Sequence, residues 1–271
     1  MFVTPAWVLV LLGAGTGLVG AMLGLGGGVF LVPLLTVGLG LPIREAITAS
    51  LISVIATASA SATVNLNRGL VNLRLGLLLE MATSVGGLGG ALLSAWLTQR
   101  QLFLTFAATM ALMSAAMLIR SGRRNVIEDT GQDPGLLGGR IEEDGKAYVY
   151  HLRRTPVALG SSLGAGAISG LLGLGGGIVK VPVLSTFCGI PIKVAAGTST
   201  FMIGVTAATS AFVYYSRGDL NPELTAAVCL GALPASLLGA RLSQRVQARS
   251  LKLLMAVVLL MVGVRMALEG L

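Results

Sequence analysis

Two copies of one motif decide how this chain folds: GLGGGVFLVPLL at residues 24–35 and GLGGGIVKVPVL at residues 173–184. Each copy lies inside a long apolar run, and in each a proline follows the last glycine by five residues. Glycine reaches backbone angles that other residues avoid, and proline removes a backbone donor. The motif therefore predicts an interruption of an otherwise continuous apolar helix, and it does so twice.

The composition of the chain is that of a membrane protein. Of its 271 residues, 54% are hydrophobic and 11% are charged, and the mean hydropathy is +0.87. Soluble domains carry about 25% charged residues, and a helix needs about 20 apolar residues to cross the hydrocarbon. We therefore predict an all-α integral membrane protein with about eight transmembrane helices, at residues 6–23, 46–66, 75–97, 102–119, 157–172, 194–215, 222–240 and 251–268.

Two shorter apolar segments, at residues 29–39 and 178–190, follow the glycine clusters, and each contains a proline. They are too short to cross the bilayer comfortably. Irregular backbone is tolerated at membrane depth where it is surrounded by protein or lines a cavity. We therefore predict broken or re-entrant helices at the two GLGGG motifs.

The chain is an internal repeat with an offset of 149 residues. GTGLVGAMLGLGGGVFLVPLL at residues 15–35 aligns without a gap with GAGAISGLLGLGGGIVKVPVL at residues 164–184. Glycines, prolines and an arginine stay in register as far as residue 91, which general apolar similarity would not achieve. We predict a first transmembrane repeat at 1–120, an extramembrane linker at 121–155 and a second transmembrane repeat at 156–271.

Such repeats are typical of transporters, whose sites lie at the repeat interface near the midplane, although channels and some membrane enzymes also have them. Four full crossings per half would make the repeats parallel. One crossing more or fewer would make them inverted.

The linker differs in composition from the rest, because it holds most of the acidic residues and the only histidine, His151. RIEEDGKAYVYHL, at residues 140–152, predicts a β-hairpin that turns at Asp144-Gly145. Arginines at both ends of the linker favour the cytoplasmic side. We interpret His151 as a solvated loop residue rather than a ligand.

The remaining charges and cysteines indicate no further partner. The formal net charge of +8 comes from Lys and Arg that mostly flank apolar runs, which is typical of topology-setting loops and not of nucleic-acid binding. Cys188 and Cys229 are far apart and lack histidine neighbours, so we predict core residues and no disulfide, metal site or cofactor. MFVTPAW at the start lacks the basic residues of a secretory signal, so the first run is expected to be retained.

A broken helix in lipid leaves backbone groups without partners, which is tolerated where they meet a ligand. A helix that restarts after the break presents free N–H groups and the positive end of its dipole, and these can bind an anion. Close helix packing is the alternative explanation for small residues, and we assign that role to Gly13, Gly15, Gly17, Gly86, Gly87, Gly89 and Gly90. For the motifs we predict anion binding by the backbone at Gly24, Gly26, Gly27, Gly28, Gly173, Gly175, Gly176 and Gly177.

Lys180 lies three residues after the second cluster, where the first half has Leu31. An ammonium group inside the membrane is costly and points to function. We predict that Lys180 offsets the charge of a bound anion; the alternative is a side chain that extends to the membrane interface.

A row of hydroxyl side chains recurs in both halves. Ser50, Thr57 and Ser61 match Ser199, Thr206 and Ser210 at the offset of 149. Each trio lies within about 40° on one helix face. Interhelical hydrogen bonds and a polar substrate lining explain the row equally well, and we predict Ser50, Thr57, Ser199 and Thr206 as lining residues.

Glu80 has no acidic counterpart, because the second half has Cys229 at that position. We predict that Glu80 lies at the membrane interface near Arg74, in preference to a proton-carrying role. Arg68 and Arg217 are predicted as interfacial anchors rather than guards of an anion entrance. No nucleophile, base and orienting group occur together, so we predict no catalytic residues and no enzyme.

The doubled motif, in a duplicated chain of about eight spans, resembles the sulfite exporter TauE/SafE family. The resemblance covers both halves and leaves out the linker. It implies a multi-pass transporter of the bacterial inner membrane that moves small sulfur-containing anions, such as sulfite or organosulfonates.

With no ATP-binding motif, the expected function is secondary transport, powered by an ion gradient or by the membrane potential, which would favour export from a negative interior. Rocking of the repeats would alternate access. The expected partners are the anion, the lipid bilayer, a coupling ion and, in a homo-oligomer, further copies of the chain. The alternatives are a passive anion channel and a membrane-embedded enzyme or assembly factor that uses the linker.

Overall fold

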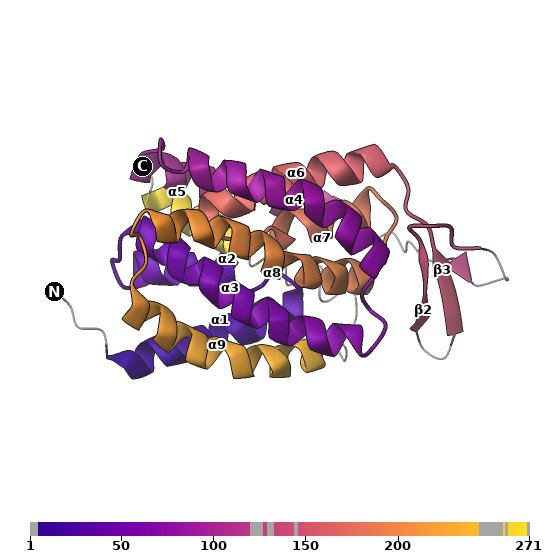
Figure 1. Cartoon of the computed structure of the whole chain (residues 1–271), viewed down its shortest axis with the longest axis horizontal. Coiled ribbons are helices and arrows are strands. Elements are labelled where there is room, and N and C mark those ends of the chain that lie inside the picture. The colour runs from indigo at the N-terminus through magenta and orange to yellow at the C-terminus, as the bar shows by residue number, and fades with distance from the viewer. Residues whose placement is uncertain are drawn as a thin grey trace.

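The structure is a computed structural model that describes residues 5–119, 127–128, 133–143, 146–243, 257 and 260–269. The first half contains α1 (Ala6–Leu23), α2 (Gly28–Pro33), the π-helical turn η1 (Leu34–Gly38), α3 (Ile43–Leu66), α4 (Leu73–Leu93) and α5 (Gln99–Ile119). Three strands follow, β1 (Ile127–Glu128), β2 (Gly139–Glu143) and β3 (Lys146–Tyr150). The second half contains α6 (Thr155–Leu172), α7 (Gly177–Thr186), α8 (Ile192–Ser216) and α9 (Pro222–Leu242), as Figure 1 shows.

Six helices of the described chain are long and apolar enough to cross a membrane: α1, α3, α4, α6, α8 and α9. They coincide with six of the predicted spans, although α4 ends at Leu93, short of the predicted residue 97. The predicted span at 102–119 forms α5. Of the predicted span at 251–268, the structure describes residue 257 and the helical residues from 260 onward.

The helices form a bundle in which the two halves are interleaved. α3 and α8 pack together in the middle, α1 packs on α9 along one side, and α4 packs on α6 along the other (Figure 1). The offset of 149 carries α1 onto α6 and α4 onto α9, so the two outer contacts are equivalent and each joins one half to the other. The interface between the halves therefore runs through the whole bundle.

Glycines make the outer contacts close. A Cβ atom at Gly13 or Gly17 would clash with the backbone of α9 at Val228 or Ala232, and Gly86 and Gly90 lie equally close to the backbone of α6. Small residues let helix backbones approach in this way. The packing prediction is wrong for Gly15 and Gly89, which have nothing within 4 Å of a Cβ position. Both lie on exposed faces of their helices, which no helix in the described residues covers.

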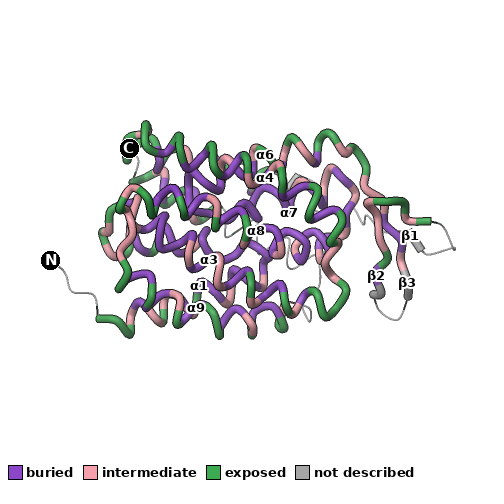
Figure 2. The backbone as a smooth tube through the Cα atoms, in the orientation of Figure 1, coloured by how far each residue is buried: buried purple, intermediate pink, exposed green. Residues whose placement is uncertain are grey.

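Burial in this bundle has the distribution expected in lipid. The exposed faces of the helices carry large apolar side chains. The inner faces, especially those of α3 and α8, are buried (Figure 2). Hydroxyl groups and one lysine are among the fully buried side chains. Because lipid tails solvate the apolar exterior, the polar groups of the spans gather inside. The outermost apolar residues of α4 include Leu77, Met81 and Val85.

The strands form a small antiparallel sheet in the order β1-β3-β2, beyond one end of the bundle (Figure 1). Glu143 pairs with Lys146, and the predicted turn residues between them lie outside the described residues. The Asn72 side chain, at the start of α4, donates hydrogen bonds to the carbonyl oxygens of Leu137 and Gly138, at 3.1 and 3.0 Å. The linker therefore holds the loop between α3 and α4.

The linker also contacts the second half, because the Arg153 N–H donates to the carbonyl oxygen of Cys188, in the loop between α7 and α8. His151 is half-buried rather than solvated, and its Nδ1 lies 3.1 Å from the carbonyl oxygen of Pro134. Burial raises the pKa of the Tyr150 hydroxyl, and a hydrogen bond from Asn72 opposes that shift.

Candidate functional site

Each GLGGG motif is a short loop between two helices. α1 ends at Leu23, and Gly24 follows in the left-handed conformation with φ 70°. α2 begins at Gly28, after Gly26 and Gly27 have taken φ values of 77° and 82°. Residues with a Cβ atom rarely adopt these angles, which is why the loop is built of glycine. The second motif repeats the geometry between α6 and α7, with φ values of 74°, 73° and 77° at Gly173, Gly175 and Gly176.

The two loops cross at the centre of the bundle. A Cβ atom at Gly28 would lie 2.5 Å from the carbonyl oxygen of Gly173, and one at Gly177 would lie 2.7 Å from that of Gly24. At the same crossing, Gly26 and Gly175 both pack on the Val54 and Ile203 side chains, which come from α3 and α8. The glycines thus allow the loop of one half to touch the loop of the other, and the structure brings all eight predicted glycines into one region.

The hydroxyl row of α3 supports this crossing. The Ser50 Oγ donates to the carbonyl oxygen of Gly173 at 2.7 Å, and the Thr57 Oγ1 donates to that of Gly26 at 2.9 Å. Both side chains are buried. They satisfy carbonyl groups that the broken helices would otherwise leave without partners.

The equivalent row of α8 is used differently. The Thr206 Oγ1 donates to the Oε1 atom of Glu80 at 2.7 Å, and the Ser210 Oγ donates to the carbonyl oxygen of Thr206. Among the described residues, the buried Ser199 Oγ has no hydrogen-bond partner, nor has the Ser61 Oγ on α3. The two halves therefore share a backbone geometry but differ in their side-chain contacts.

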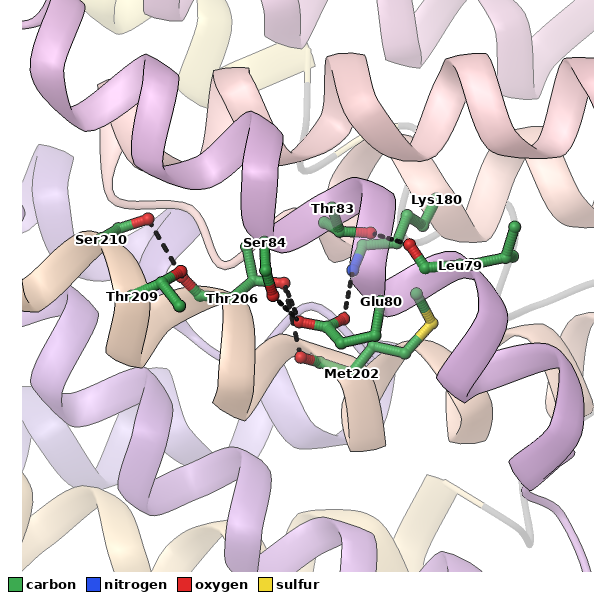
Figure 3. Close-up of polar contacts among 9 residues, drawn as sticks. All are labelled: Leu79, Glu80, Thr83, Ser84, Lys180, Met202, Thr206, Thr209 and Ser210. Atoms are coloured by element: carbon green, nitrogen blue, oxygen red, sulfur yellow. Dashed lines mark hydrogen bonds and ion pairs between the residues drawn. The ribbon is translucent and has the colours of Figure 1, made fainter.

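Glu80 lies inside the bundle, so its predicted place at the membrane interface is wrong. It projects from the buried face of α4 and is 7% exposed. Its Oε1 atom accepts hydrogen bonds from Thr206 and from the Ser84 Oγ, the latter at 2.9 Å. Its Oε2 atom lies 3.7 Å from the Nζ atom of Lys180 (Figure 3). A signal for this position exists in the sequence, because Gly76, Glu80 and Gly87 recur at helical spacing on one face.

Lys180 is completely buried, which rules out an extended side chain that reaches the membrane interface. Its Cε atom lies 3.2 Å from the place of a Cβ atom at Gly176, so the side chain folds back toward the start of α7. Nζ makes no hydrogen bond within the described part of the chain, although an ammonium group has three donors. The 3.7 Å separation from Glu80 is an ion pair that is too wide for a hydrogen bond.

Further unused donors surround Lys180. The Ser169 Oγ is buried without a partner, and its Cβ atom lies 3.4 Å from the same point beside Gly176. In the described residues the N–H groups of Gly175, Gly176 and Gly177 also donate no hydrogen bond. An ammonium group, a hydroxyl group and the positive end of α7 therefore come together, and such a set is suited to bind oxyanions.

A small pocket approaches this region from one end of the bundle. Its lining includes Gly24, Asn65, Lys193 and Thr200. The carbonyl oxygen of Gly24 is the atom against which Gly177 packs, at the start of α7. Gly24 therefore belongs both to the lining of the pocket and to the crossing.

Arg217 has a structural contact that the sequence did not predict. Its guanidinium donates to the Ser94 Oγ and to the carbonyl oxygen of Leu92, both at 3.1 Å, and it lies 5.8 Å from the centroid of the Tyr214 ring. It therefore caps the end of α4, where a cation also complements the helix dipole.

Apolar outer faces and six candidate spans are the features of a multi-pass membrane protein. The family model described as "Sulfite exporter TauE/SafE" matches residues 9–266, so the chain belongs to that family. It is 27% identical over 270 residues to the "Probable membrane transporter protein YunE" of Bacillus subtilis (strain 168), a match that covers 97% of each chain. No solved structure matches the chain. The predicted family is thus confirmed, and it is a family of transporters and not of enzymes.

Proposed function

We propose that the protein is a secondary transporter that exports a small sulfur-containing anion, sulfite or an organosulfonate, across the cytoplasmic membrane. The observation that carries this proposal is the buried Lys180 Nζ, which has no hydrogen-bond partner in the described residues and lies beside the start of α7. The anion would bind there, with the N–H groups of Gly175–Gly177 and the Ser169 hydroxyl as further donors.

The lengths of α2 and α7 support a re-entrant topology. α7 has 10 residues, which corresponds to about 15 Å of helix, or half of the hydrocarbon thickness. The apolar segment Gly28–Gly38, formed by α2 and η1, is of similar length. Two half-crossings that meet would place the loop crossing near the midplane, and α5 and the residues at 251–268 would complete eight spans.

The interleaved halves support alternating access. Rocking of one repeat against the other would open the crossing first to one side and then to the other. The pocket lined in part by Gly24 would be the access route on one of these sides. Ser199, whose hydroxyl group is unpaired in the described residues, would join the lining as the site opens.

Ligand-induced thermal shifts of the purified protein test the proposal, with sulfite, sulfate, thiosulfate and methanesulfonate as probes. We expect at least one of the sulfur oxyanions to raise the melting temperature and Lys180→Met to abolish the shift. Arg74→Met is the control, because Arg74 is an exposed cation on α4, and it should retain the full shift. An unchanged shift in Lys180→Met would show that the anion binds elsewhere.

Flux into proteoliposomes then separates a transporter from a channel. Saturable flux that is specific for the bound anion supports the transporter. Unsaturable, ohmic conductance would instead identify a passive anion channel.

A further inference from the structure

The ion pair of Glu80 and Lys180 joins the two halves and is electrically neutral. Glu80 comes from α4 of the first half, and Lys180 comes from α7 of the second half. The offset of 149 relates these positions to Cys229 and Leu31, neither of which carries a charge. The chain therefore holds one such pair although its backbone is duplicated.

The surroundings of Glu80 contain no other charge in the described residues. α6, which packs on α4, carries no ionisable side chain. α8 faces Glu80 with the Thr206 hydroxyl, while its Lys193 lies at one end of the helix and Arg217 follows the other. Arg74 of α4 is exposed, and α7 contributes only Lys180. Of the groups in the described part of the chain, Lys180 is thus the one that balances the carboxylate.

An anion that binds Lys180 would add a negative charge to this neutral site. An uncompensated charge in a dry interior is strongly unfavourable. We infer that Glu80 takes up a proton when the anion binds to Lys180, so that one proton is carried with each monovalent anion. The empty site then holds a carboxylate and an ammonium group, and the loaded site holds a carboxylic acid, an ammonium group and the anion. Both states are neutral, so the concentration gradient of the anion and the pH gradient, and not the membrane potential, set the direction of transport; export follows when the anion accumulates inside the cell.

The hydrogen bonds of Glu80 identify the atom that receives the proton. Oε1 already accepts from Thr206 and Ser84, and these bonds can persist in the acid form. Oε2 accepts no hydrogen bond in the described residues and faces Lys180. A proton that arrives from the water therefore forms an O–H bond at Oε2, and the Lys180 ammonium group is released to the anion. This step rests on the proposed function, because it requires that the anion bind at Lys180.

Proteoliposomes with a pH-sensitive dye inside test the coupling, with the membrane potential clamped by valinomycin and potassium. Methanesulfonate is the probe, because it remains monovalent between pH 5 and pH 8 and cannot itself carry the proton; sulfite is measured in parallel. We expect a methanesulfonate gradient to move protons in the same direction in a 1:1 ratio, with no response to the imposed potential. Anion flux without proton movement would overturn the coupling and leave the transporter intact. Flux of neither anion would refute the proposed function itself.

Glu80→Gln tests whether Glu80 is the group that takes up the proton. The amide imitates the protonated carboxyl group and leaves Lys180 without a counter-charge. Methanesulfonate binding to the wild type should weaken with rising pH, by up to about tenfold per pH unit, the limit for one linked proton. As long as Lys180 stays protonated, binding to Glu80→Gln should be tight and independent of pH, and anion exchange should continue without proton movement. Glu223→Gln, an exposed carboxyl group on α9, should behave as the wild type. Proton movement that persists in Glu80→Gln would assign the coupling to another group.

The double variant Glu80→Gln/Lys180→Met distinguishes loss of anion binding from loss of folding. It removes both charges, so no unpaired charge remains in the bundle to destabilise the fold. It should remain folded and fail to bind methanesulfonate at any pH. Binding by the folded double variant would contradict the inference.

Discussion

The buried ion pair makes a quantitative prediction about stability. Lys180→Met keeps the length of the side chain but leaves the Glu80 carboxylate unpaired in the bundle. Removal of one partner of a buried pair typically costs about 3–5 kcal/mol, most of it from the stranded charge. Because Nζ and Oε2 are 3.7 Å apart, beyond hydrogen-bond distance, we expect the lower end, about 3 kcal/mol.

The second substitution should reverse most of this loss. In Glu80→Gln/Lys180→Met the amide oxygen can still accept hydrogen bonds from Thr206 and Ser84, and no charge remains. Replacement of a whole buried pair is often neutral or even stabilising. The free energy of unfolding of the double variant should therefore lie within about 1 kcal/mol of the wild-type value. The coupling energy between the two sites would then be about 2 kcal/mol or more, within the range for directly contacting residues.

Unfolding in detergent can be followed with a thiol-reactive dye, because Cys188 is buried and unbonded. Arg74→Met reports the effect of losing an exposed cation, which should stay within about 0.5 kcal/mol. A double variant as unstable as Lys180→Met would refute the reasoning. The loss would then belong to the packing of the lysine stem against Gly176 and not to the charge.

Two further comparisons use positions that the duplication makes equivalent. Ser50→Ala should lower the free energy of unfolding by about 1–3 kcal/mol, because it leaves the buried carbonyl group of Gly173 without its hydrogen bond. Ser199→Ala removes a hydroxyl group without a described partner and should leave the free energy of unfolding unchanged. Equal losses in the two unfolding curves would contradict this assignment. Asn72→Ala and Asn221→Ala each remove a helix cap, worth about 1 kcal/mol, but only Asn72 also binds the linker. Limited proteolysis should therefore cut the linker faster in Asn72→Ala alone, and similar rates in the two variants would show that the linker is held elsewhere.

The backbone of the site could be predicted from the sequence because glycine and proline act locally. GLGGG permits left-handed angles wherever it occurs, and its repetition at a fixed offset indicates that two such loops are paired. The hydroxyl row could be placed on one helix face by spacing alone. What these residues contact could not be predicted, because the partners of Ser50 and Thr57 come from loops that only the folded bundle brings near.

The position of Glu80 was missed for a physical reason. In a soluble helix an apolar stripe marks the buried face, but in lipid both faces are apolar. α4 exposes Leu77, Met81 and Val85 and buries Leu75 and Leu79, so hydropathy does not distinguish its two sides. The same ambiguity explains the error at Gly15, because a small residue marks a close contact only when its face is known.

The two copies of the motif share a backbone geometry but differ in the polar side chains around it. The crossing needs both copies, because each loop packs on a carbonyl group of the other. Three positions near the crossing differ in polarity, since Ser169, Lys180 and Glu80 correspond to Gly20, Leu31 and Cys229. Two buried ion pairs would double the desolvation penalty, whereas one neutral pair limits it. Under the proposed mechanism, charge at one copy alone would confine anion and proton binding to one end of the crossing, while the apolar copy would preserve the loop contacts about which the halves would rock.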